Sequence, residues 1–287
     1  MQSQHYNFRV GVFACTSLLD GYVNYPIQNL FSNVPLEEAK AELRRHALPD
    51  DIVTTPYTYL LVRTGQNNVL VDMGAGAFFP STGGLVQSLG MAGLSPDQID
   101  TVIISHAHPD HIGGMLDEHG QYVYPNARCF MIQAEWDFWF SETAFTKTDP
   151  HMVSFARKNL EPVKAHVERV EGICEILPGI HLIPAIGHTP GHAVVRVESQ
   201  GQKLVYVADT VLQPLNLEHP DWLPIYDILP EAAALSKRRV FDLAAAEHSL
   251  VLGQHFPPFP SLGYITKRDP GWLWEPIDSC DEKSLCV

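Results

Sequence analysis

The chain has 287 residues and a formal net charge of −14, from 19 Lys and Arg against 33 Asp and Glu. With 45% hydrophobic and 18% charged residues, its composition is that of a globular protein and excludes long disordered tracts. The acidic balance argues against nucleic acid as a partner, because phosphate binding needs a surplus of Lys and Arg. The sequence lacks a signal-peptide pattern and any apolar run of the roughly 20 residues that cross a bilayer. We therefore expect a cytoplasmic protein without a membrane partner.

Segments typical of strands and helices alternate along the chain, and no low-complexity tract divides it. The first half predicts strands over residues 8–16, 57–63, 69–72 and 101–105 and a helix over residues 85–91. The second half predicts strands over residues 129–133, 167–176, 180–186, 193–198, 203–209 and 249–253. Its predicted helices cover residues 134–141, 152–165 and 230–248. This alternation favours a single layered domain over residues 1–287 that mixes strands and helices.

A dense cluster of possible metal ligands directly follows the apolar strand predicted at residues 101–105. Residues 106–111 read His-Ala-His-Pro-Asp-His, and imidazole and carboxylate groups suit Zn, Fe, Mn or Co. Because residues two apart at a strand end can point the same way, His106 and His108 can converge on one ion. Asp110 and His111 then lie around the turn, where they can serve a neighbouring ion. This spacing predicts a metal site rather than a set of solvated loop histidines.

Three further ligand candidates each follow a predicted strand. His188 lies within Gly-His-Thr-Pro-Gly-His at residues 187–192, Asp209 ends the run at 203–209, and His255 follows the strand at 249–253. Each is weak alone, since an aspartate at a strand end is often only a cap. Together they place His, Asp and His at strand ends, where the edge of a sheet could bring them beside the first cluster.

These motifs, in this order, resemble the signature of the metallo-β-lactamase superfold. The resemblance covers about residues 8–260 and implies an α+β fold, a four-layer αββα sandwich with metals in a cleft between two sheets. It implies that the site binds two divalent ions per chain. Zinc is the expected metal, with Mn, Co or Fe as alternatives. The ligands that it implies for the first ion are His106, His108 and His188. Those that it implies for the second ion are Asp110, His111 and His255, with Asp209 as the bridge between the ions.

The resemblance also assigns supporting roles near the ligands. It implies that Asp72 orients a ligand imidazole and that His192 packs behind the site, as metal-bound histidines commonly require. A homodimer contact through residues 1–55 is a further expectation, whereas residues 268–287 form a C-terminal tail with no functional interpretation.

The surroundings of the motifs are similar to the methyl parathion hydrolase and lactonase-like branch of the superfold. In that branch an aromatic pocket grips an apolar leaving group, which implies pocket positions here for Phe79, Trp139 and Trp136. The spacing of Trp136 and Trp139 also fits one buried face of a helix, so core packing stays open for both. The best-known lactonases of the branch carry a tyrosine three residues after the bridging aspartate, where this chain has Leu212. That difference argues against acyl-homoserine lactone specificity but leaves hydrolysis unaffected.

We therefore expect a hydrolase. Two cations that share a water lower its pKa far below about 15.7, and the resulting hydroxide would attack a neutral ester, lactone or organophosphate triester. Asp110, beside that nucleophile, is the expected catalytic acceptor of its proton. Two alternatives remain: a glyoxalase-like thioesterase, and a mononuclear iron persulfide dioxygenase that uses only His106, His188 and Asp209. Metal stoichiometry separates the dioxygenase from the hydrolase.

Overall fold

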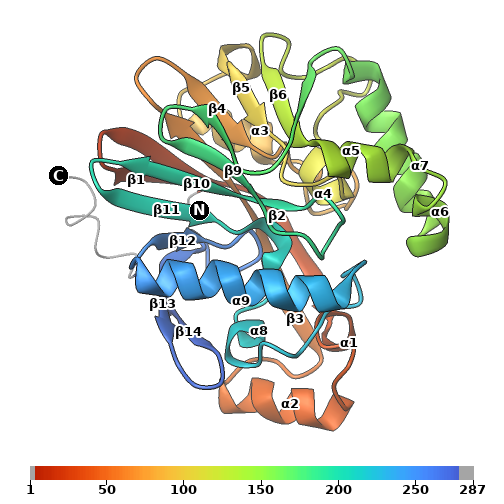
Figure 1. Ribbon diagram of the computed structural model, residues 1–287, viewed down its shortest axis with the longest axis vertical. Helices are drawn as coiled ribbons and strands as arrows, with labels where there is room; N and C mark the ends of the chain where they lie inside the picture. The colour runs from red at the N-terminus through yellow and green to blue at the C-terminus, as the bar shows by residue number, and fades with distance from the viewer. Residues whose placement is uncertain (1–3, 278–287) are drawn as a thin grey trace.

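Two β-sheets packed face to face form the centre of the molecule in the computed structural model, which describes residues 4–277 (Figure 1). The first sheet runs in chain order from β1 to β7, with antiparallel pairs up to β4 and parallel pairs from β4 to β7. Its strands are β1 (His5–Val10), β2 (Phe13–Pro26), β3 (Ile52–Arg63), β4 (Asn68–Val71), β5 (Thr101–Ile103), β6 (Arg128–Ile132) and β7 (Val167–Val170).

The second sheet has the order β14-β13-β12-β11-β10-β9-β8. Within the described residues its neighbouring strands are antiparallel, except for the parallel pair β11 and β12. Its strands are β8 (Cys174–Leu177), β9 (Ile180–Pro184), β10 (Ala193–Ser199), β11 (Gln202–Tyr206), β12 (Leu250–Leu252), β13 (Leu262–Lys267) and β14 (Trp272–Pro276).

Helices cover the outer face of each sheet and complete the four layers (Figure 1). The first sheet is covered by α3 (Leu85–Met91), α5 (Gln133–Phe140) and α7 (Pro150–Leu160), and the second by α9 (Pro230–Ala246). The shorter helices are α1 (Ile27–Leu30), α2 (Leu36–Arg45), α4 (Pro109–Ile112), α6 (Ala144–Lys147) and α8 (Leu215–Glu218), with 3-10 turns at Pro96–Gln98, Glu161–Val163 and Ala208–Thr210. The predicted αββα sandwich is confirmed. No helix among residues 4–277 is long and apolar enough to span a membrane.

Strands that are buried on both faces hold the layers together. In β4, Val69 and Val71 join the core between the sheets, whereas Leu70 faces the helices outside the first sheet. In β10, Val195 points between the sheets and Val194 points toward α9. Because successive side chains of a strand point to opposite faces, a strand covered on both sides becomes a continuous apolar run. These are the runs from which the sequence predicts the central strands.

Two of the predicted strands are each split in the structure. The run at residues 8–16 is divided between β1 and β2 by a tight turn, in which Gly11 has a φ of +56°. The run at residues 167–176 is divided between β7 and β8, which lie at the edges of different sheets. Gly172, with a φ of +62°, lies in that connection. An apolar pattern continues through such turns, so it does not reveal where one strand ends and the next begins.

The two ends of the chain contribute strands to the sheets. Residues 4–55 contain β1, β2, α1, α2 and the start of β3, and the expected dimer contact through this segment stays a prediction. In the C-terminal tail, β14 pairs with β13, and Trp272 of β14 is fully buried against α9. Residues 278–287 of the predicted tail lie outside the described part of the chain.

Candidate metal centre

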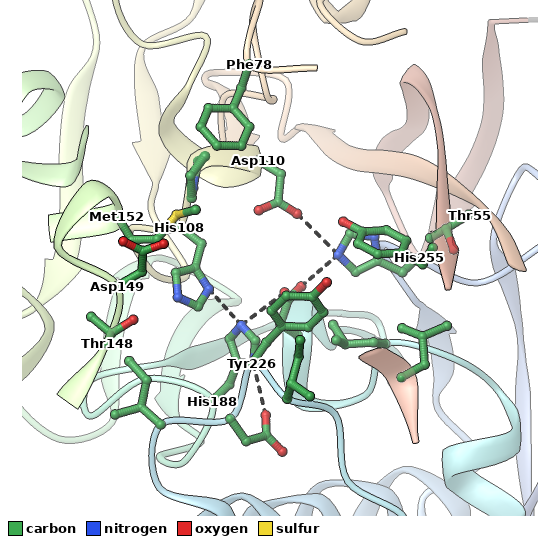
Figure 2. A pocket seen from close by; sticks show the side chains of 18 of the residues that line it. Thr55, Phe78, His108, Asp110, Thr148, Asp149, Met152, His188, Tyr226 and His255 are labelled. Carbon is green, nitrogen blue, oxygen red and sulfur yellow. Dashed lines mark hydrogen bonds and ion pairs between the residues drawn. The ribbon is translucent and has the colours of Figure 1, made fainter. Parts of the chain in front are cut away.

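The seven predicted ligands meet at one edge of the sandwich because they follow strands from both sheets. The loop after β5 carries His106 and His108, and the short helix α4 carries Asp110 and His111. From the second sheet, His188 precedes β10, Asp209 lies in the turn after β11, and His255 follows β12. Figure 2 shows His108, Asp110, His188 and His255 converging on one cavity.

The first group of possible ligand atoms consists of three imidazole nitrogens and one carboxylate oxygen. His108 Nδ1 lies 3.1 Å from His106 Nε2 and 2.8 Å from His188 Nε2. Asp209 Oδ2 lies 3.2 Å from His188 Nε2 and 3.8 Å from His106 Nε2. Ligands of a tetrahedral zinc ion with bonds of about 2.0 Å would be about 3.3 Å apart. The spacing of this group therefore suits one such ion.

The second group uses the other oxygen of the same aspartate. Asp209 Oδ1 lies 3.2 Å from His111 Nε2 and 3.2 Å from His255 Nε2. Asp110 Oδ2 lies 3.3 Å from His255 Nε2 and 3.6 Å from His111 Nε2. The two oxygens of Asp209 thus face different groups, which is the geometry that a carboxylate bridging two cations requires.

The polar atoms of the site fit cations better than they fit one another. His111 Nε2 and Asp209 Oδ1 are buried, and neither has a hydrogen-bond partner among the described residues. Burial and the neighbouring His188 imidazole lower the pKa of His108 to about 3, so its ring is neutral and keeps a lone pair. Burying unpaired polar groups costs free energy, and a bound cation would offset this cost. The donor set of imidazoles and carboxylates suits zinc.

Two residues with predicted supporting roles contact the ligands directly. Asp72 Oδ2 lies 2.8 Å from His111 Nδ1, and its carboxylate also accepts hydrogen bonds from the amide and hydroxyl of Ser105 at 2.7 Å. His192 Nε2 accepts a hydrogen bond from the amide of Asp209 at 3.1 Å. Contacts of this kind fix the orientation of a ligand.

Glu135, on α5, is a buried carboxylate that the sequence argument missed. Its Oε1 accepts hydrogen bonds from the amide of Ala107 at 2.9 Å and from the Trp139 indole at 2.6 Å. Its Oε2 accepts hydrogen bonds from the Thr189 hydroxyl at 2.5 Å and from the amide of Gly191 at 3.0 Å. One side chain therefore ties the loop of His106 and His108 to the loop of His188. The only signal in the sequence is an acidic residue four positions before Trp139, within an apolar helix face.

Asp227 is a second supporting carboxylate that the sequence argument missed. Its Oδ1 lies 3.0 Å from His188 Nδ1, on the side of the ring that faces away from the ligand group. The backbone strengthens the same junction, since the amide of Ile228 donates to the carbonyl of His188 at 3.0 Å. Asp227 belongs to a loop with no recognisable motif, so no sequence signal marks it.

A cavity of about 540 Å³ opens over the two ligand groups. Its polar lining residues include Tyr25, Thr55, Lys147, Asp149 and Tyr226. Its apolar lining residues include Leu30, Phe78, Phe79, Met152, Leu212, Ile225 and Ile228. The arrangement can therefore hold a small molecule with an apolar portion against a metal centre.

The three aromatic residues expected in the pocket have different positions. Phe79 lines the cavity, whereas Trp136 and Trp139 are not among its lining residues. Trp139 is fully buried beneath the site, with its ring 5.6 Å from that of His108, and Trp136 stacks on Phe140 at 4.5 Å. The pocket prediction is corrected for both tryptophans, because α5 turns its aromatic face toward the core and not toward the cavity.

Comparison with known proteins agrees with this architecture. The model of the family described as "Metallo-beta-lactamase superfamily" matches residues 53–255, so the chain belongs to that superfamily. An N-acyl homoserine lactonase of Bacillus thuringiensis is 23% identical over 230 residues, which cover 72% of this chain and 84% of that protein. A second N-acyl homoserine lactonase, from Bacillus sp, is 24% identical over 229 residues, with the same coverage of 72% and 84%.

Two solved structures superpose on nearly the whole chain. AidC, a dizinc quorum-quenching lactonase in complex with a product, has a TM-score of 0.91 and 28% identity and covers 96% of this chain and 99% of its own. The hydrolase AbOPH has a TM-score of 0.89 and 26% identity and covers 97% of this chain and 99% of its own. Together with the paired ligand groups, these findings make the protein a metal-dependent hydrolase that acts on ester bonds.

Proposed function

We propose that this protein opens the lactone ring of a neutral small molecule, with one zinc ion in each ligand group. The observation that carries the proposal is that Asp110, His111 and His255 complete a second group beside the first. A mononuclear iron dioxygenase would need only His106, His188 and Asp209, so it leaves the second group unexplained. The lactonases among the similar proteins support a lactone over the other esters.

Some residues of the site would hold the metal ions, and others would take part in the reaction. Two bound cations would polarise the substrate carbonyl and lower the pKa of water. Asp209 would hold both ions through its two oxygens, and Asp110 is the group to which we assign the proton of the attacking water. Asp110 is held on two sides: Gln254 Nε2 lies 3.4 Å from its Oδ2, and the Tyr59 hydroxyl donates to its carbonyl at 2.5 Å.

The cavity supports a neutral substrate with an apolar substituent. Phe78, Phe79 and Met152 form part of its apolar wall, against which an acyl chain would lose unfavourable contact with water. The net charge of −14 disfavours the long-range approach of anions. N-acyl homoserine lactones meet both conditions, although Leu212 replaces the tyrosine that the best-known lactonases of this branch place after the bridging aspartate.

The test is a substrate panel with zinc-loaded protein. N-hexanoyl-L-homoserine lactone, an unsubstituted γ-lactone, a neutral phosphotriester and a thioester should be compared by kcat/KM, with zinc counted by mass spectrometry. We expect two zinc ions per chain and the highest kcat/KM for the acylated lactone. A higher value for the phosphotriester or the thioester would overturn the lactone assignment. One iron per chain with uptake of oxygen would support the dioxygenase instead.

A further inference from the structure

We propose that the hydroxyl of Tyr25 donates a hydrogen bond to an oxygen of the bound substrate. Tyr25 lies on β2, far in sequence from the ligand motifs, yet its side chain lines the same cavity as Asp110, Asp209 and His255. The inference rests on the proposed lactone hydrolysis and adds a donor that none of the metal-site motifs contains.

The neighbouring strand fixes the direction of this donor. Tyr57 on β3 is fully buried, and its hydroxyl lies in close contact with the hydroxyl of Tyr25. Within residues 4–277 this contact is the only hydrogen bond of the Tyr57 hydroxyl. A buried hydroxyl needs an acceptor, so Tyr57 donates to the Tyr25 oxygen. The proton of Tyr25 is then free to point into the cavity.

The pair of tyrosines lies against the second ligand group. The ring of Tyr57 packs edge-on against His255, with ring centres 4.8 Å apart. Burial, and then the negative charges of Asp110 and Asp209, raise the pKa of Tyr25 well above its usual range. The phenol therefore remains a protonated donor at neutral pH. An oxygen that gains negative charge during ester hydrolysis is stabilised by such a fixed donor.

A second phenol on the cavity wall provides a matched comparison. Tyr226, labelled in Figure 2, packs edge-on against Tyr25 with ring centres 6.0 Å apart. Its hydroxyl accepts a hydrogen bond from Asn29 Nδ2 at 2.9 Å. At position 212 the leucine offers no hydroxyl. Tyr226 is held by Asn29, whereas Tyr25 is held by Tyr57, whose ring packs against His255, so Tyr25 is the phenol tied to the second ligand group.

The experiment compares Tyr25→Phe with Tyr226→Phe and Tyr57→Phe, since each change removes one hydroxyl and keeps the ring. With N-hexanoyl-L-homoserine lactone and zinc-loaded protein, we expect Tyr25→Phe to lower kcat by about 10- to 100-fold, the range for losing one such donor. Tyr57→Phe and Tyr226→Phe should each lower kcat less than Tyr25→Phe does. Tyr264→Phe, at a tyrosine of β13 that is not among the cavity's lining residues, is the control and should stay within about threefold of wild type. Calorimetry should show weaker binding of the ring-opened N-hexanoyl-L-homoserine to Tyr25→Phe, with two zinc ions retained.

The outcomes separate this inference from the proposed function. Wild-type protein that does not hydrolyse the lactone would overturn the proposed function itself. Active wild-type protein together with unchanged kcat in Tyr25→Phe would overturn only the role of Tyr25. A larger loss in Tyr226→Phe or Tyr57→Phe would assign the donor elsewhere. Loss of zinc or of folding in Tyr25→Phe would make Tyr25 a structural residue and would likewise overturn the inference.

Discussion

Asp209 differs from the other six candidate ligands because its two oxygens face different ligand groups. We predict that Asp209→Ala loses at least one of two zinc ions and lowers turnover by about 10³-fold or more, since water activation needs the metal pair. Zinc content and kcat measured on the same preparation check this. Asp137→Ala, at an exposed aspartate of α5, is the control. Full activity with two zinc ions in Asp209→Ala would remove this residue from the site.

Glu135 offers a sharper test of positioning because its hydrogen bonds within residues 4–277 come from Ala107, Trp139, Thr189 and Gly191 and not from a candidate ligand side chain. Glu135→Gln keeps the shape of the side chain. Its new amide nitrogen, itself a donor, must face another donor such as the amide of Gly191, whose hydrogen bond the wild-type carboxylate accepts. We predict that zinc affinity falls by about 10- to 100-fold, the usual effect of losing a group that orients metal ligands. Competition with a chromophoric chelator measures this affinity. Glu142→Gln, at an exposed position, should bind zinc like wild type, and equal affinity in both variants would contradict the prediction.

Spacing in the sequence determines which individual site residues can be predicted. The seven ligand candidates occur in short motifs or at strand ends, and the structure brings all seven together. Glu135 and Asp227, and Tyr25 in its proposed role, depend on contacts between segments distant in the chain. Their positions depend on tertiary packing, so no fixed spacing in the sequence marks them. The two tryptophans of α5 show the opposite failure, since apolar spacing fits a core face and a pocket wall equally well.

Helix α9 contains a buried charge that makes stability depend on pH. Lys237 is almost fully buried, and its Nζ donates to the carbonyls of Pro220 at 3.1 Å and Trp222 at 3.3 Å. Burial lowers the pKa of Lys237 to about 8. The unfolded chain, with a pKa of about 10.4, therefore binds more protons between these two values. The penalty for burying the ammonium is present below pH 8 and disappears as the pH rises toward 10.4.

We predict that wild type gains roughly 3 kcal/mol of unfolding free energy relative to Lys237→Met between pH 7 and pH 10.4. Urea unfolding of both proteins at several pH values measures the difference, and titrating groups common to both cancel. Lys267→Met, which removes an exposed lysine, should show no such change relative to wild type. A difference between wild type and Lys237→Met that is constant with pH would contradict the prediction.

The secondary structure shows which elements a sequence pattern can define. The strands predicted at residues 57–63 and 69–72 pair as β3 with β4, and those predicted at 193–198 and 203–209 pair as β10 with β11. In each case turn residues separate two apolar runs, which is the sequence pattern of a hairpin. Strands β13 and β14 were not predicted. Their sequence mixes exposed and buried residues, and β14 is held in place by Trp272 packing beneath α9. Strands such as these, at the edge of the second sheet and next to it, depend on tertiary contacts more than on their own pattern.

In the whole molecule, both sheets contribute ligands to the same two groups. His106, His108, Asp110 and His111 follow the first sheet, whereas His188, Asp209 and His255 follow strands of the second. Bound metal would therefore connect the two halves of the sandwich across their shared edge. A ligand that binds only the folded state stabilises it by about 4 kcal/mol when its free concentration is 1,000 times Kd.

We predict that chelation lowers Tm by about 10 °C, since 1 kcal/mol corresponds to about 2–4 °C in chains of 150–250 residues. Calorimetry of zinc-loaded protein with and without a chelator, with zinc counted in each sample, measures the shift. Asp209→Ala should start from a lower Tm and respond less to the chelator, because it has less metal to lose. If zinc is removed and Tm is unchanged, contacts such as those of Glu135 hold the ligand loops without metal. The centre would then be preformed. The free energy gained when the two sheets fold would by itself offset the cost of burying the unpaired nitrogens and oxygens of the site.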